Sequence, residues 1–207
     1  IAHRIDQGCS PAPTFTYLDE NFRLGFTLTA QNAAGATTRN YFWNFARLDL
    51  NTVANLKLAG IAGSTMFKTG NGRLALLQSS GSWASGVATV TLTASATRTA
   101  TPDGPFDSAG FGIAPVDLDG AAMLSLDLDT DSPPNGVDSA RVGTIPLRYG
   151  RLRLQNGTAP ANRTLSLPLA AQYWTGSAYN TNTLDSCTRI SATQLSFGNL
   201  RNVAIAN

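Results

Sequence analysis

The sequence is poor in the residues that most often cover exposed helices. It contains one Glu, Glu20, and two Lys, Lys57 and Lys68, and charged residues make up only 14% of its 207 residues. Because Glu and Lys are strong helix formers, their scarcity argues against helical bundles and doubly wound α/β enzymes. The basic residues are scattered and the formal net charge is +2, so we expect no nucleic-acid groove.

Long apolar runs and catalytic groupings are also missing. No stretch approaches the roughly 18 apolar residues that a membrane span requires. The chain begins at Ile1 without a signal-like segment, and we expect a mature or excised part of a longer protein. Its single His, His3, lies in an unpatterned segment, and one Glu with scattered Asp offers no carboxylate pair for glycoside hydrolysis. We therefore expect no enzymatic activity.

Threonine and turn-forming residues are abundant. The chain contains 24 Thr, which suit half-exposed strands, and 19 Gly and 10 Pro, which supply turns between many short strands. Apolar and polar side chains alternate over residues 22–30 and 87–97, the period-2 pattern of a strand with one buried face. About a dozen such segments predict an all-β fold of immunoglobulin-like β-sandwich units, with antiparallel strands and little or no helix.

Three further segments carry weaker patterns. Residues 41–50 are dense in aromatics, and we expect a strand there with Trp43 in the core. Leucines alternate with polar side chains over residues 124–128, which predicts another strand. Residues 51–59 fit the spacing of a short helix.

The chain divides into a linker and two β units. Residues 1–13 lack periodicity and contain Gly8 and two prolines, so we expect a linker there. The apolar alternation changes phase beside Gly150, which indicates a β-bulge or a crossing between layers. We therefore expect one β-sandwich over residues 14–146 and a second β domain over residues 147–207. With about 60 residues, the second unit should be incomplete or packed on the first.

The two cysteines, Cys9 and Cys187, lie near opposite ends of the chain. An even number of cysteines in a Thr-rich, Lys-poor β protein favours a disulfide and an oxidising compartment. That compartment points to a secreted, extracellular or cell-surface protein. The alternative is a pair of free, buried thiols.

Six Asp residues between positions 117 and 138 form the densest cluster of charge. Asp127, Asp129 and Asp131 would point to one side of a strand, where carboxylates repel each other unless a cation or Arg compensates them. Because Ca²⁺ accepts six to eight oxygen ligands, a calcium site is one hypothesis, although the spacing is not that of an EF-hand. The alternative is a solvated acidic edge that deters pairing with other sheets. No other cofactor is expected.

Aromatic side chains offer a second candidate site. Trp174 is out of phase with the apolar residues of its strand, so we expect it to leave the core face, and Tyr179 follows after a short turn. We nominate Trp174 and Tyr179 for stacking against a sugar ring. The alternative is burial, because sandwiches commonly bury aromatic rings.

Several segments, taken in their order along the chain, are similar to the sequences of a known family. From the N-terminus they are FTYLDENFRLGFTLTAQNAAGATTRNY, GSWASGVATVTL, TPDGPFDSAGFGIAPVDLDG, LRYGRLRLQN and AAQYWTGSAYNTNTLDSCT. Over about Cys9 to Cys187 the chain resembles a domain of unknown function near the C-terminus of MshQ-like proteins. These are named after the biogenesis of the mannose-sensitive haemagglutinin type IV pilus in Proteobacteria. The resemblance implies export, association with a pilus or the cell surface, and no assigned catalytic residue.

Composition, fold class and resemblance together predict a non-enzymatic, extracellular structural or adhesive segment of a type IV pilus-associated or cell-surface protein. The expected partners are other segments of a larger parent protein and components of the pilus or cell surface. Neither a nucleic acid nor a membrane span is expected. The alternative is a carbohydrate-binding module that uses exposed aromatics to bind glycans, with or without calcium.

Overall fold

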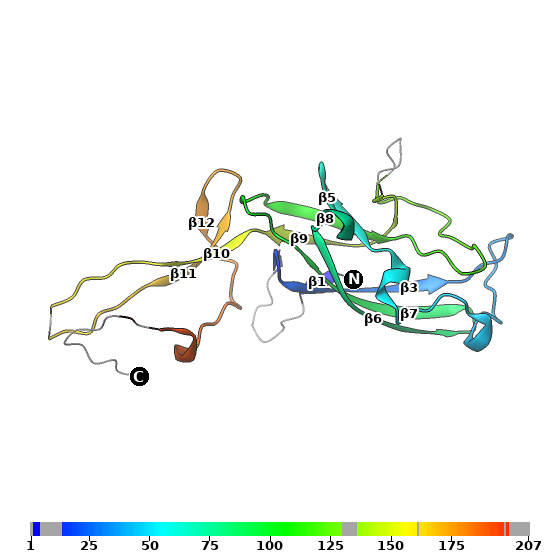
Figure 1. The fold of residues 1–207 in the computed structure, drawn as a ribbon, viewed down its shortest axis with the longest axis horizontal. Coiled ribbons are helices and arrows are strands. Elements are labelled where there is room, and N and C mark those ends of the chain that lie inside the picture. Colours follow the sequence, from blue (N-terminus) through cyan, green and yellow to red (C-terminus); the bar gives the residue numbers. More distant parts are fainter. Residues whose placement is uncertain (1, 5–13, 130–135, 161, 197, 199–207) are drawn as a thin grey trace.

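The protein is nearly all β, as the sequence predicts. The computed structural model describes residues 2–4, 14–129, 136–160, 162–196 and 198. In these residues the strands form three sheets (Figure 1), and the helical elements are short 3-10 turns. The turns are η1 (Trp43–Phe45), η2 (Val53–Leu56), η3 (Thr69–Asn71) and η4 (Ala192–Gln194).

The first sheet is antiparallel throughout. Its order is β1–β3–β7–β6, with the bounds Ala2–Arg4, Asn21–Thr29, Val87–Ala96 and Leu74–Ala84. The alternation predicted for residues 22–30 and 87–97 is confirmed, because Leu24 pairs with Leu92 and both are fully buried. One face of the sheet therefore supplies half of the core.

The second sheet covers the first and contains one parallel pair. Its order is β2–β9–β8–β4–β5, with the bounds Thr16–Tyr17, Ala140–Arg148, Phe106–Ile113, Ala59–Ala62 and Thr65–Phe67. Strand β2 runs parallel to β9, and the other pairs are antiparallel. The predicted antiparallel pairing therefore holds in this sheet except between β2 and β9, where the chain enters alongside the strand by which it leaves the sandwich.

The two sheets have the strand order of an immunoglobulin fold. Lettering the nine strands A, A′, B, C, C′, D, E, F and G in chain order gives A–B–E–D in the first sheet and A′–G–F–C–C′ in the second. Immunoglobulin domains divide their strands in the same way. Side chains from both sheets meet in the core, where the rings of Phe22 and Phe111 lie 4.8 Å apart between centroids.

The third sheet is small and has no core of its own. It consists of β10 (Gly150–Leu154), β11 (Leu169–Trp174) and β12 (Tyr179–Thr181), joined as consecutive antiparallel hairpins. Of the described residues beyond Tyr149, the half-buried Trp174 and Tyr179 pack against the core of the sandwich. The hairpin of β10 and β11 instead carries leucines that are 36% to 59% exposed, namely Leu152, Leu154, Leu165, Leu167 and Leu169.

The strand boundaries refine the expected division of the chain. Within the expected linker, residues Ala2–Arg4 form β1, and residues 5–13 lie outside the described part. Strand β9 ends at Arg148, so the sandwich extends two residues beyond the expected boundary at 146. The phase slip beside Gly150 marks a crossing between layers, since β10 begins there in a different sheet. A Cβ atom at Gly150 would lie 2.5 Å from the ring of Tyr17, which explains the glycine.

Two strand predictions are wrong. Residues 41–50 form a loop containing η1, and Trp43, expected in the core, is 84% exposed. Residues 124–128 form an irregular segment in which Leu124 is 86% exposed while Leu128 is buried. Both segments lie in long connections of the sandwich, where tertiary contacts outweigh the local alternation of side chains. The short helix expected over residues 51–59 is present only as η2.

Candidate functional site

Three connections of the sandwich gather at the end far from the third sheet (Figure 1), and we call this the loop end. Their described residues are 30–58 between β3 and β4, 85–86 between β6 and β7, and 114–129 and 136–139 between β8 and β9. In immunoglobulin variable domains, the loops after strands B and F gather at one end and bind antigen. The loop end of this chain is built from the equivalent connections.

The tip of the β6–β7 hairpin is bonded to the connection after β3. The Gly86 carbonyl accepts a hydrogen bond from the Ala30 N–H at 2.8 Å, and the Gly86 N–H donates to the Tyr41 carbonyl at 3.1 Å. Gly86 has a φ of 79°, and a Cβ atom there would lie 2.4 Å from the Thr38 carbonyl oxygen. Only glycine permits both this conformation and this close approach.

Tyr41 joins the loops after β3 and β8. Its hydroxyl donates a short hydrogen bond to the carboxylate of Asp117 and accepts the N–H groups of Arg47 and Leu48 at 3.2 and 3.1 Å. Asp117 is only 8% exposed and also accepts the Asp119 N–H at 3.0 Å. Burial and the hydrogen bond to Asp117 raise the pKa of Tyr41 above its ordinary value of 10.0.

A groove of about 590 Å³ opens at the loop end, with Trp83 and Tyr41 among its lining residues. The two rings are nearly perpendicular, with centroids 4.7 Å apart. The Trp83 indole N–H donates to the Leu48 carbonyl at 3.1 Å, which fixes the orientation of the indole. Apolar contacts from strands and loops complete the wall, supplied by Leu28, Leu48, Pro115 and Met123.

Polar side chains form the rest of the groove lining. They include Gln31, Asn32, Thr38, Asp117, Asp119, Ser125, Asp127 and Arg141. The Asp127 carboxylate accepts the Arg141 N–H at 2.8 Å, and the Arg141 guanidinium donates to the Leu128 carbonyl at 3.3 Å. Strand β9 therefore orders the loop that precedes it. The groove combines an aromatic wall with hydrogen-bonding groups, as small-molecule sites commonly do.

An exposed apolar tip accompanies the groove. Trp43 and Phe45, both in η1, are 84% and 69% exposed, and Leu118 in the loop after β8 is also exposed. Trp43 has a φ of 48°, which is strained for a bulky side chain. Such strain concentrates at functional positions. Sequence patterns do not predict this exposed tip, because its aromatic residues resemble those of a buried strand.

The structure describes two of the three aspartates nominated for calcium. Asp127 and Asp129 lie in an irregular segment rather than on one face of a strand, and Asp131 lies outside the described residues. In the described part of the chain, no group of three or more His, Cys, Asp or Glu side chains is arranged to hold a metal ion. The calcium hypothesis therefore stays a prediction.

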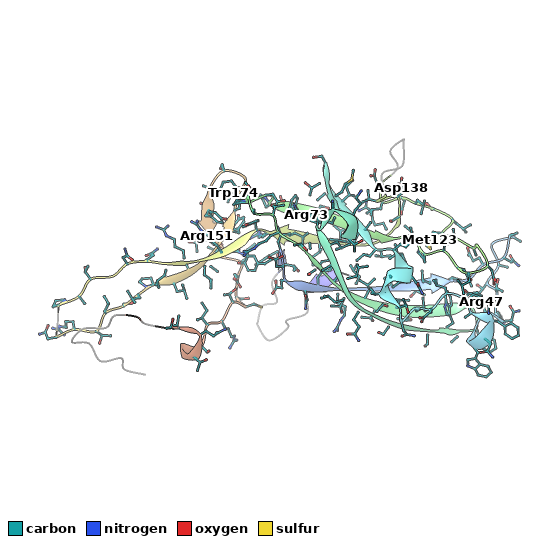
Figure 2. The ribbon with its side chains drawn as sticks, viewed as in Figure 1. Arg47, Arg73, Met123, Asp138, Arg151 and Trp174 are labelled. Atoms are coloured by element: carbon teal, nitrogen blue, oxygen red, sulfur yellow. The ribbon has the colours of Figure 1, made fainter. Side chains whose placement is uncertain are left out.

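Trp174 and Tyr179 lie where the third sheet meets the sandwich. Figure 2 shows Trp174 and Arg151 in the third sheet, far from Arg47 and Met123 at the loop end. Their rings pack edge to face with centroids 5.3 Å apart, and the Arg151 guanidinium lies 3.6 Å from the centre of the Tyr179 ring. Both aromatic residues are half-buried. Stacking of a sugar on this pair stays a prediction, and Arg151 already occupies one face of Tyr179.

A polar network joins the sandwich to the third sheet. The Tyr17 hydroxyl donates to Asp185 at 2.9 Å and accepts from the Asn182 amide at 2.7 Å. Arg148 donates to the Asn182 side-chain oxygen at 2.7 Å, and its guanidinium also stacks on the ring of Tyr173. Asn182 is only 4% exposed. We call Tyr17, Arg148, Asn182 and Asp185 the joint.

Asp185 is held in its charged form at the joint. Burial alone would raise its pKa, but hydrogen bonds from Thr188, Cys187 and Tyr17 outweigh burial and lower the pKa below its ordinary value of 3.8. Cys187 itself is buried. The predicted Cys9–Cys187 disulfide stays a prediction, because Cys9 lies outside the described residues.

Comparison with known families divides the chain where the sandwich ends. Residues 2–142 match DUF6701, third domain, and residues 148–206 match DUF6701, fourth domain. The interval between the two matches lies within β9. No curated protein and no solved structure matches the chain. Among the residues that the structure describes, no helix has the length and apolar character needed to cross a membrane.

Proposed function

This chain belongs to the DUF6701 family, and from that premise we propose that it is a non-enzymatic, extracellular structural and adhesive segment of a larger surface protein. Its two units act as a spacer that presents the loop end to a partner. The resemblance to MshQ-like proteins supports a place on the cell surface or with a type IV pilus. A Thr-rich sandwich with few Lys and two cysteines is consistent with an exported protein.

The joint is the observation that carries this proposal. A spacer must fix the direction of its binding end, and four side chains from both units share hydrogen bonds there. Hydrogen bonds that involve charged groups contribute about 1.5–3 kcal/mol each when well formed. The joint therefore supports a fixed orientation, with the loop end at the far side of the molecule (Figure 1).

The loop end supports the adhesive part of the proposal. Apolar side chains on loop tips, held by a rigid scaffold, are typical of binding surfaces. Trp43, Phe45 and Leu118 are exposed there, beside the groove. A carbohydrate-binding module is the second candidate, and the fixed Trp83 ring in that groove favours it.

Display on intact cells tests the proposed function. An antibody fragment raised against the loop end should bind living cells that produce the parent protein, and it should block their attachment to a surface. A fragment against the β5–β6 region should bind the same cells without blocking attachment. Binding of the two antibody fragments only after the cells are lysed would contradict the proposal.

A further inference from the structure

The groove at the loop end has the dimensions of a ligand site. Its volume of about 590 Å³ lies within the roughly 300–1,000 Å³ that is typical of small-molecule clefts. The connection after β3 is bonded to each of the other two, to the β6–β7 turn at Gly86 and to the connection after β8 through Tyr41 and Asp117. The walls are therefore tied together before any ligand arrives, which reduces the entropy lost on binding.

The aromatic wall of the groove is fixed in place. Trp83 is half-buried, its indole N–H is bound to the Leu48 carbonyl, and the Tyr41 ring meets it edge-on. Tyr41 is held in turn by its hydrogen bonds to Asp117, Arg47 and Leu48. By contrast, Arg151 covers one face of the Tyr179 ring in the third sheet.

The polar lining can meet hydroxyl groups. The side-chain oxygen of Asn32 accepts the N–H groups of Ala34 and Ala36, which leaves its amide NH₂ to donate elsewhere. Gln31 and Ser125 are exposed, and each offers both a donor and an acceptor. Hydroxyl groups both donate and accept, so this mixture complements a ligand that carries several of them.

Charge narrows the class of ligand further. The lining contains three carboxylates, Asp117, Asp119 and Asp127, against one guanidinium, that of Arg141. Arg141 is also engaged with the Leu128 carbonyl. A ligand that carries carboxylate, sulfate or phosphate groups would meet an excess of like charge.

We propose that the groove binds a neutral saccharide, with the apolar C–H face of a sugar ring against Trp83 and the hydroxyls on the polar lining. The proposal rests on the proposed function, because it names the partner of the loop end. It moves carbohydrate binding from Trp174 and Tyr179, where the third sheet meets the sandwich, to the loop end. The fixed ring, the hydroxyl-matching groups and the excess of carboxylates together select this class over acidic glycans.

Binding of the intact chain to an array of neutral, sialylated and sulfated glycans tests the proposal, with titration of any that bind. We expect neutral glycans to bind and their acidic derivatives to bind more weakly. Trp83→Phe keeps a ring but shortens the stacking surface, and we expect it to raise Kd about tenfold. Leu152→Ala is the control, since Leu152 is exposed on β10 in the third sheet and is not part of the groove lining.

A second variant tests the groove without changing Trp83, whose substitution could alter folding. Ser125 is an exposed lining residue, so Ser125→Trp should fill the groove and abolish binding while the melting temperature stays unchanged. Preference for acidic glycans, an equal loss of binding in Trp83→Phe and Leu152→Ala, or binding that survives Ser125→Trp would overturn the proposal. If no glycan binds but the loop-end antibody still blocks attachment, the saccharide proposal fails and the proposed function stands.

Discussion

The hydroxyl of Tyr17 lies 2.9 Å from a carboxylate oxygen of Asp185, a residue 168 positions further along the chain. Tyr17 belongs to β2 of the sandwich, whereas Asp185 follows the last strand of the third sheet. The same hydroxyl accepts the amide of Asn182. One phenol of the sandwich therefore contacts two side chains of the other unit. Single substitutions can for that reason test the contribution of the joint.

Asn182→Ala should weaken the joint. It leaves the Tyr17 hydroxyl with one hydrogen bond fewer and removes the side-chain acceptor of Arg148, so we expect a loss of about 1–3 kcal/mol in the free energy of unfolding. Thermal melting measures stability, and small-angle scattering measures whether the distribution of molecular dimensions broadens. Asn180→Ala is the control, because Asn180 is exposed on β12, two residues before Asn182. Equal behaviour of the two variants would show that the joint contributes nothing.

Tyr41 should ionise above pH 10. Its raised pKa means that the folded state favours the protonated phenol, so the stabilisation is present below the unfolded pKa of 10.0 and is lost as the pH rises through the folded pKa. In an absorbance titration of tyrosinate, Tyr41→Phe should remove a component above pH 10. Asp117→Asn should shift that component to lower pH, because the anion that opposes ionisation is gone. A titration curve that neither variant alters would refute this account.

Residues 148–207 should not fold when expressed alone. Small sheets need a buried apolar face, and here the leucines of the β10–β11 hairpin are exposed while Trp174 and Tyr179 pack against the sandwich. We expect no cooperative thermal transition and poor dispersion of amide NMR signals from this fragment. Residues 1–148 provide the control and should melt cooperatively. A sharp transition in the short fragment would show that the third sheet has a core of its own.

Cys9 and Cys187 should be joined by a disulfide. Non-reducing mass spectrometry of proteolytic peptides detects the bond directly. A bridge that closes so long a loop should contribute about 4–5 kcal/mol by loop-closure entropy, so reduction should lower the melting temperature. A Cys9→Ser, Cys187→Ser double variant should melt at the lower temperature with or without reductant. Alkylation of both thiols in the untreated, folded protein would disprove the bond.

The strands of the sandwich were predictable where side-chain alternation coincides with burial. Ala88, Val90 and Leu92 alternate with threonines, and the structure buries the apolar set as predicted. Alternation in one segment indicates only which side chains would share a face. It does not indicate whether a neighbouring strand is present to pair with that segment. That is why the alternation over residues 124–128 predicts a strand, whereas the structure has an irregular segment there.

The loop end was not predictable for a related reason. The aromatic residues near Trp43 have the composition of a buried strand, but a hydrogen bond between Tyr41 and Asp117, 76 positions apart, holds this segment in a loop. Contacts over such distances leave no periodic signal in the sequence. The only local hint was the length of the connection between β3 and β4, since long loops are often functional.

The parallel pairing of β2 with β9 has a mechanical consequence. A pull applied between the start of β2 and the end of β9 drags the two strands past each other, so their hydrogen bonds resist together instead of opening one by one from an end. The Leu18 N–H adds a further bond to the Arg148 carbonyl at that position. A segment tethered on a surface under fluid flow would thus be loaded along its most resistant direction.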